Sequence, residues 1–272
     1  MISGVLLDIG GVLHEGERAT DGGPQALAAL RRAGVPLRFA TNTSRCARAA
    51  VAERLRGLGY AVEAEQILTA PRAAAQAVTE RGLRPYLIAH PDLEPDLRGL
   101  ETRNPGAVLI ADAAEQFTYR RLNAAFRLLL RGAPLLAVAR NRYFQEEDGL
   151  SLDMGPFVAA LEYASGAEAE LYGKPAAAFF RQGAAELGLP PHEVLMVGDD
   201  VEADVQGALA AGLQAALVRT GKYRPGDERA GDLPFPVFDS LAEVVRWLLA
   251  PDGAPVDERC RQASSRGRRG HG

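Results

Sequence analysis

The chain has 272 residues, of which 47% are hydrophobic and 24% charged, and its formal net charge is −4 at pH 7. This composition is typical of a soluble globular protein, and the net negative charge disfavours a nucleic-acid partner. No apolar stretch approaches the roughly 20 residues that span a bilayer, and the apolar start lacks the features of a signal peptide. The two cysteines, Cys46 and Cys260, provide no disulfide framework and suit a reducing cytoplasm.

Strands and helices alternate from the start of the chain. The apolar run over residues 1–7 predicts a first strand, and residues 25–33 predict an amphipathic helix that a glycine closes. Residues 35–40 predict a second strand, and a helix with Ser44 as its N-cap is expected over residues 44–58. Strands separated by helices of this length indicate parallel βαβ units.

The same alternation continues to residue 249. Further strands are predicted over residues 86–89, 107–111, 135–139, 194–197 and 215–218. Further helices are predicted over residues 72–81, 119–130, 156–164, 177–187, 205–211 and 241–249.

The pattern predicts an α/β fold with a Rossmann-like, doubly wound parallel sheet and an inserted smaller α/β cap domain. We expect the core to comprise residues 1–71 and 172–250, and the cap residues 72–171. Glycine, proline, serine and arginine dominate residues 251–272, which predicts a disordered tail.

Two acidic motifs follow strand-like segments at opposite ends of the chain. Asp8 ends the first apolar run, and Gly198-Asp199-Asp200 with Asp204 follows the apolar residues 194–197. Ligands bind at the carboxyl ends of the strands of open α/β sheets. Carboxylates gathered at that edge repel one another unless a cation lies between them, so the motifs predict a metal site and suggest phosphate chemistry. Taken alone, Asp8 could instead be a strand-end aspartate that caps the next turn, and the acids of residues 199–204 could cap one helix and its first turn.

Two further polar motifs have ordinary structural interpretations when each is taken alone. Thr41-Asn42 could be a turn before a helix, and Lys174 in Gly173-Lys174-Pro175 could be a solvated loop residue. At a shared sheet edge, however, the hydroxyl and the amide could bind phosphate oxygens and the lysine could offset their charge. The lysine is notable because the chain has only one other, Lys222.

In this order, the motifs at Asp8, Thr41, Lys174 and residues 198–204 resemble the haloacid dehalogenase superfamily of phosphohydrolases. The insert between the threonine and lysine motifs looks like the α/β cap of its nitrophenylphosphatase-like branch. Several shorter stretches are similar to the group around phospholysine phosphohistidine inorganic pyrophosphate phosphatase. These stretches are residues 6–13, 84–86, 155–157, 160–164 and 220–224, and the resemblance covers residues 1 to about 250.

The resemblance implies a role for each motif. Asp8 is the implied nucleophile, which forms an aspartyl-phosphate that water then hydrolyses. Mg²⁺ is the implied cofactor, with Asp8, the Gly10 carbonyl and Asp199 as its protein ligands. Lys174 is a second implied catalytic residue. Asp200 and Asp204 are expected to support the metal ligands or to orient Lys174. The residues implied to bind the substrate are Asp8, Ile9, Gly10, Thr41, Asn42 and Lys174.

Gly10 departs from the pattern of most phosphatases of the superfamily, which have a second aspartate there as general acid and base. Without that acid, leaving groups that need no proton from the enzyme should be favoured. Pyrophosphate, aryl phosphates and N-phosphorylated side chains meet this condition better than alkyl phosphates. The expected function is therefore a Mg²⁺-dependent phosphohydrolase for such substrates.

The main alternative is a catalytically weak regulatory protein that binds phosphate and Mg²⁺. The expected partner is a phosphorylated small molecule or a phospho-amino-acid side chain, with neither nucleic acid nor membrane. A homodimer and a cytoplasmic location complete the expectations.

Overall fold

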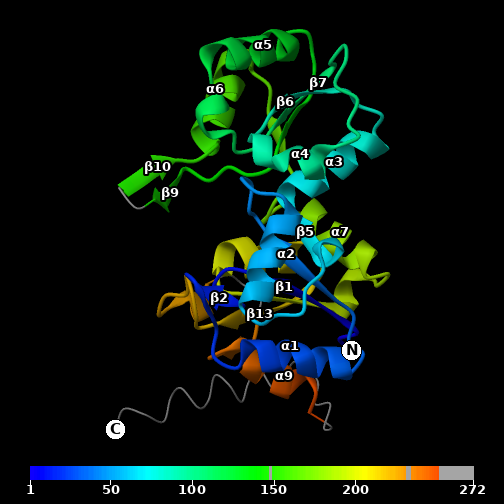
Figure 1. Cartoon of the computed structure of the whole chain (residues 1–272), viewed down its shortest axis with the longest axis vertical. Coiled ribbons are helices and arrows are strands. Elements are labelled where there is room, and N and C mark those ends of the chain that lie inside the picture. Colours follow the sequence, from blue (N-terminus) through cyan, green and yellow to red (C-terminus); the bar gives the residue numbers. More distant parts are fainter. Residues whose placement is uncertain (147–148, 231–233, 251–272) are drawn as a thin grey trace. The chain divides into compact units, whose positions relative to one another are not determined.

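The computed structural model describes residues 1–146, 149–230 and 234–250, which form two compact α/β units (Figure 1). The first, which we call the core unit, contains residues 1–41 and 52–67 and the described residues from 175 onward. The second, the cap unit, contains residues 42–51 and 68–174. The predicted domain division, with a cap over residues 72–171, stays a prediction, and the predicted disordered tail lies outside the described residues.

The core unit is built on a parallel sheet of six strands in the order β14-β13-β12-β1-β4-β5. Its central strands, β1 (Gly4–Asp8) and β12 (Val194–Gly198), are buried at every residue and pair from Gly4 with Val194 to Leu7 with Val197. Continuous apolar strands of this kind occur where both faces of a parallel sheet are covered. The other strands are β4 (Leu37–Thr41), β5 (Ile67–Thr69), β13 (Gln214–Val218) and β14 (Val237–Phe238).

Helices cover both faces of this sheet. In Figure 1, α1 (Gly23–Arg32) and α9 (Leu241–Leu248) lie side by side below the strands, and α7 (Ala177–Glu186) lies above them, where it packs against α8 (Gly207–Ala210). Two strands, β2 (His14–Glu15) and β3 (Arg18–Ala19), form a hairpin after β1. The remaining helical segments are α2 (Arg48–Gly57), whose residues 48–51 belong to the cap unit, η1 (Ala64–Gln66), η4 (Pro191–Glu193), η5 (Val201–Gln206) and η6 (Asp227–Arg229).

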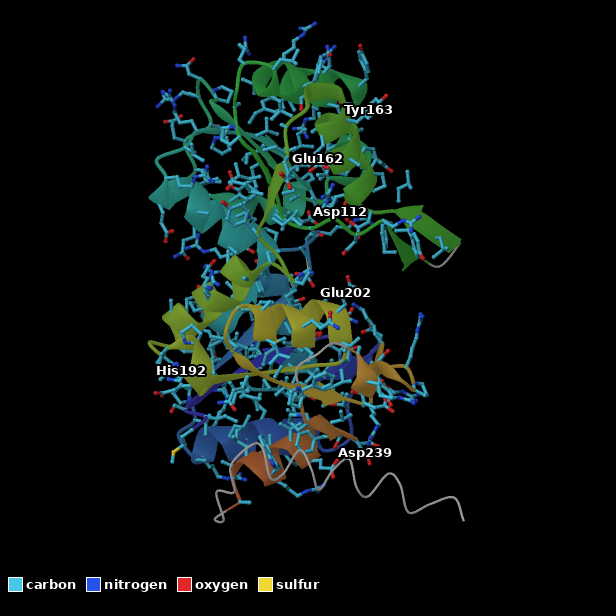
Figure 2. All side chains as sticks on the ribbon, turned by 180° about the vertical axis from the view of Figure 1, so that it is seen from behind. Asp112, Glu162, Tyr163, His192, Glu202 and Asp239 are labelled. Atoms are coloured by element: carbon cyan, nitrogen blue, oxygen red, sulfur yellow. The ribbon has the colours of Figure 1, made fainter. Side chains whose placement is uncertain are left out.

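The cap unit has its own parallel sheet of four strands, in the order β11-β8-β7-β6, and its own apolar core. Its strands are β6 (Pro85–Ile88), β7 (Ala107–Ile110), β8 (Leu135–Ala137) and β11 (Ala169–Leu171), and β9 (Tyr143–Glu146) pairs with β10 (Gly149–Leu152) in a separate hairpin. Its helices are α3 (Ala70–Glu80), η2 (Pro91–Leu93), α4 (Glu94–Leu97), η3 (Ala114–Gln116), α5 (Tyr119–Leu129) and α6 (Gly155–Ser165), whose Tyr163 lies at the surface (Figure 2). The predicted fold class is confirmed.

The predicted start of α2 is wrong, and the reason is a long-range contact. The helix begins at Arg48 and not after Ser44. The backbone N–H of Arg48 donates to the Asp96 carboxylate at 2.8 Å, so a side chain far away in the sequence caps this helix. The β2–β3 and β9–β10 hairpins and the short strands β5, β11 and β14 were not predicted either. No helix among the described residues has both the length and the apolar character needed to cross a membrane.

Candidate active site at the carboxyl ends of the core strands

Three buried aspartates meet where the central strands of the core unit end. Asp8 ends β1, Asp199 directly follows β12, and Asp204 lies in the helical turn η5. The exposed fractions of these residues are 7%, 2% and 0%, and one carboxylate oxygen of each lies within 4.8 Å of the others. Asp8 and Asp199 are therefore neighbours, as the sequence predicts.

Three glycines leave the space that these carboxylates occupy. A Cβ on Gly198 would lie 2.2 Å from the Cβ of Asp204. Gly11 and Gly221 both have positive φ, and a Cβ on either would lie 2.1 Å from Oδ2 of Asp199. The Asp199 carboxylate thus lies between two loops whose backbones approach it so closely that only glycine fits at Gly11 and Gly221.

Replacing Gly221 by alanine should therefore weaken the binding of a divalent cation to this cluster. Gly16→Ala is the matched control, since Gly16 has a similar φ, +56° against +60°, but open space around its Cβ. Both variants place an alanine at a positive φ, which costs about 1–2 kcal/mol of backbone strain. Only Gly221→Ala should also raise the magnesium concentration for half-saturation, by about tenfold or more, because it displaces a carboxylate. Titration calorimetry measures this, and equal affinities for the two variants would contradict the role given to Gly221.

The donor set of the cluster suits a hard divalent cation. Carboxylate oxygens are preferred ligands of Mg²⁺, and two of them bound near 2.1 Å lie about 3.0–4.2 Å apart on an octahedral ion. The ligand oxygens of the three aspartates, one from each, lie within 4.8 Å of one another, so small side-chain movements would allow them to share one ion. Three buried carboxylates this close together repel one another, and a bound cation removes that cost. The residues present therefore fit a metal ion, with Asp8, Asp199 and Asp204 as candidate ligands.

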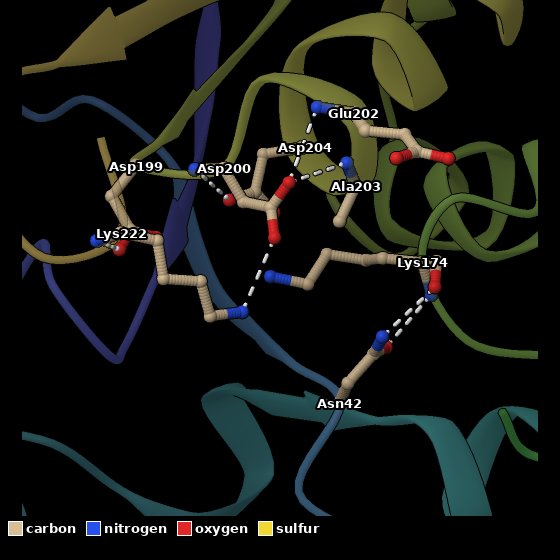
Figure 3. A network of polar contacts seen from close by, with 8 residues as sticks. All are labelled: Asn42, Lys174, Asp199, Asp200, Glu202, Ala203, Asp204 and Lys222. Atoms are coloured by element: carbon tan, nitrogen blue, oxygen red, sulfur yellow. Dashed lines mark hydrogen bonds and ion pairs between the residues drawn. The ribbon is translucent and has the colours of Figure 1, made fainter. Parts of the chain in front are cut away.

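Asp200 connects this cluster to Lys222 (Figure 3). Its side chain accepts hydrogen bonds from the backbone N–H groups of Glu202 and Ala203 and so caps η5, while its own N–H donates to Asp204 Oδ2 at 3.2 Å. This cap explains why the predicted helix 205–211 begins earlier, at Val201, as a π-helical turn. Glu202 itself is exposed and points away from the aspartates (Figure 3).

Lys222 has no role that its sequence motif predicts, yet it contacts two of these acids, Asp199 and Asp200. Its backbone N–H donates to Asp199 Oδ2 at 2.7 Å, and its Nζ donates to Asp200 Oδ2 at 3.2 Å. Partial desolvation beside the cluster lowers the pKa of this largely exposed lysine, but the negative charges of Asp200, Asp199 and Asp8 outweigh it and raise the pKa above its ordinary value. Lys222 therefore carries a positive charge beside the cluster at neutral pH.

The loop after Asp8 leaves room at the position where a second aspartate would stand. Ile9 is buried, whereas Gly10 is exposed and forms an isolated bridge with His14. A Cβ built on Gly10 meets no atom within 4 Å, and the backbone there has no positive φ. The absence of a side chain at Gly10 is thus not a steric requirement of the fold.

Thr41 ends β4 one residue beyond Ala40, which pairs with Asp8, so the strand register brings Thr41 to the same sheet edge as the nucleophile candidate. The Thr41 side chain is buried.

Asn42 and Lys174 are the first and last residues of the cap unit, and they hold each other in place (Figure 3). The Asn42 Nδ2 donates to the Lys174 carbonyl oxygen and the Lys174 N–H donates to Asn42 Oδ1, both at 2.8 Å. A Cβ on Gly173 would lie 2.7 Å from Asn42 Oδ1, so this glycine permits the contact. The Asn42 side chain therefore orients the backbone of the buried Lys174, a function that the sequence did not reveal.

Known proteins match this chain along most of its length. The family model of haloacid dehalogenase-like hydrolases matches residues 5–103, and a second model, HAD-hydrolase-like, matches residues 171–244. Phospholysine phosphohistidine inorganic pyrophosphate phosphatase of Xenopus laevis is 42% identical over 257 residues, which are 92% of this chain and 95% of that protein. Haloacid dehalogenase-like hydrolase domain-containing protein 2 of Bos taurus is 41% identical over 91% of this chain and 96% of its own length.

Among solved structures, 4-nitrophenylphosphatase of Thermotoga maritima matches with a TM-score of 0.82 and 27% identity, over 90% of this chain and 97% of its own. Both the sequence relatives and this structure thus match across the core and cap units together. The chain belongs to the haloacid dehalogenase-like hydrolases, and within that family it is an enzyme of the phosphatase type.

Proposed function

We propose that this protein is a Mg²⁺-dependent phosphohydrolase that acts through an aspartyl-phosphate on Asp8 and favours good leaving groups. The observation that carries the proposal is the cluster of three buried carboxylates, Asp8, Asp199 and Asp204, at the carboxyl ends of β1 and β12. Such a cluster is costly for stability unless it binds a cation, and it lies at the sheet edge where α/β proteins bind ligands.

In the proposed reaction, a carboxylate oxygen of Asp8 attacks phosphorus. A new P–O bond to Asp8 forms while the bond from phosphorus to the leaving group breaks, and the leaving group takes that electron pair. A water molecule then attacks phosphorus, breaks the bond to Asp8 and releases inorganic phosphate. A bound Mg²⁺ would supply positive charge that stabilises the phosphoryl oxygens and would be held by Asp8 and Asp199, with Asp204 as a third candidate.

The other proposed roles concern the transferred phosphoryl group. The Thr41 hydroxyl and the Lys174 ammonium are proposed to bind its oxygens, together with backbone N–H groups of the loop at Ile9 and Gly10 and the segment at Asn42. Positioning and charge stabilisation of this kind supply most of the catalysis in phosphoryl transfer. The reciprocal hydrogen bonds between Asn42 and Lys174 support a role of Asn42 in aiming the lysine.

Gly10 supports the choice of substrate class. With no acid there to protonate a departing oxygen, an alkoxide would leave slowly, whereas phosphate, phenolates and nitrogen groups that take a proton from water would leave readily. The name of the Xenopus laevis relative gives phospholysine, phosphohistidine and inorganic pyrophosphate as its substrates, and we propose the same class for this chain.

Phosphate release at millimolar magnesium, with and without a chelator, tests the proposal. Turnover of pyrophosphate, phosphohistidine and nitrophenyl phosphate should exceed turnover of an alkyl phosphate, and the chelator should remove all of it. Binding of phosphate and magnesium without measurable turnover of any substrate would instead support the alternative, a regulatory protein. Activity that survives chelation would contradict the metal site.

A further inference from the structure

Lys222 is one of only two lysines in a chain whose other basic side chains, histidine apart, are arginines. It lies in the loop that follows β13, next to the acidic cluster of the core unit (Figure 3). None of the roles proposed above uses it. Its position at the carboxyl ends of the core strands nevertheless places it on the edge of the sheet where ligands bind.

The backbone of this loop is held through two successive N–H groups, the second of which is that of Lys222 itself. The N–H of Gly221 donates to Glu15 Oε1 at 2.6 Å, and the N–H of Lys222 donates to Asp199 Oδ2 at 2.7 Å. Gly221 also lies against Gly11, since a Cβ on Gly221 would come within 2.6 Å of the Gly11 Cα. The loop is therefore attached to the loop after Asp8, to the β2–β3 hairpin and to a metal-ligand candidate.

The side chain of Lys222 points toward Asp200 but remains exposed to solvent. Its Nζ lies 3.2 Å from Asp200 Oδ2, while its side chain is 73% exposed and that of Asp200 is 26% exposed. An ion pair this exposed contributes little to stability. The Lys222 ammonium has three N–H donors, and one of them donates to Asp200. The others can contact a ligand at this edge of the sheet.

We propose that Lys222 is a specificity-determining residue that binds an anionic leaving group, so that the enzyme favours pyrophosphate over N-phosphorylated side chains. This inference rests on the proposed function and specifies its substrate. When Asp8 attacks one phosphorus of pyrophosphate, the bridging oxygen leaves with the electron pair of the broken P–O bond. The ammonium of Lys222 donates a hydrogen bond to this departing phosphate and offsets its growing charge without giving up a proton.

The two substrate types differ in the charge of what departs. The leaving phosphate becomes more negative as its bond to phosphorus breaks, so a nearby ammonium stabilises it more in the transition state than in the ground state. The nitrogen of phosphohistidine or phospholysine takes a proton from water and leaves neutral or positive. An ammonium does not attract such a group, so Lys222 discriminates between the two types by charge.

Comparing Lys222→Met with Arg224→Met tests the inference. Arg224 is an exposed cation two residues away in the same loop, so its loss removes the same charge from the loop without touching Asp200. For Lys222→Met, kcat/KM for pyrophosphate should fall about 10- to 100-fold further than kcat/KM for phosphohistidine, as expected for a lost charge-assisted hydrogen bond. Lys222→Arg should recover part of the loss, and Arg224→Met should match the wild type on both substrates.

The outcomes separate this inference from the proposed function. Equal losses on both substrates for Lys222→Met, or no loss on either, would overturn the inference while leaving the phosphohydrolase intact. A wild-type protein that hydrolyses neither substrate would overturn the proposed function, and the inference with it. An unchanged melting temperature of Lys222→Met would show that a fall in kcat/KM for pyrophosphate does not arise from unfolding.

Discussion

Asp8→Asn should lower phosphate release by at least about 10⁴-fold, because the amide is a poor nucleophile and the other two carboxylates of the cluster are proposed to hold the metal ion. Asn has nearly the same shape as Asp and so fits the buried position of Asp8. The fold should therefore persist, and removing one of three crowded carboxylates should leave the melting temperature unchanged or raise it. Steady-state kinetics and thermal unfolding measure the two effects.

A covalent intermediate gives this prediction a second readout. Wild-type protein quenched in acid during turnover of labelled pyrophosphate should carry label on Asp8, and Asp8→Asn should carry none. Asp239→Asn is the matched control, since Asp239 is an exposed acid of the core unit that pairs with Arg219 (Figure 2). That variant should retain both turnover and label. Wild-type-like turnover in Asp8→Asn would exclude Asp8 as the nucleophile.

The sequence predicted the parts of the site that depend on local pattern. Asp8 and Asp199 each follow a run of buried apolar residues, so their place at a sheet edge could be inferred from the strand signal alone. The sequence interpretation expected Asp204 to support the metal ligands or to orient Lys174. The structure brings its carboxylate into the cluster because the Asp200 cap starts a helical turn directly after β12.

The parts that the sequence did not predict depend on contacts between distant residues. Asp96 caps α2, and the Asn42 side chain hydrogen-bonds to the backbone of Lys174. Lys222 hydrogen-bonds to both Asp199 and Asp200. None of these pairs has a fixed spacing that a pattern could detect. The short strands of the two hairpins were missed because two to four residues carry too little periodicity to be recognised.

Gly10→Asp should raise turnover of alkyl phosphates by about 10²- to 10⁴-fold, the usual contribution of general acid–base catalysis. The structure has room for the new side chain, since a Cβ on Gly10 meets no atom within 4 Å and the residue is exposed. Residue 10 is the position at which most phosphatases of the superfamily have their general acid, so the added carboxyl group should protonate an oxygen that departs from a phosphoryl group held at Asp8. Rates on a series of phosphate esters measure the effect.

The size of the gain should depend on the leaving group, and this dependence makes the experiment decisive. An alkoxide needs a proton as it departs, whereas nitrophenolate does not, so turnover of nitrophenyl phosphate should change by no more than about threefold. The plot of rate against leaving-group pKa should therefore be steep for the wild type and flatter for Gly10→Asp. Gly106→Asp, at a second exposed glycine with open space around it, controls for the added charge and should keep the steep slope. If the wild type hydrolysed nitrophenyl and alkyl phosphates at equal rates, the missing acid at Gly10 would not determine the substrate range.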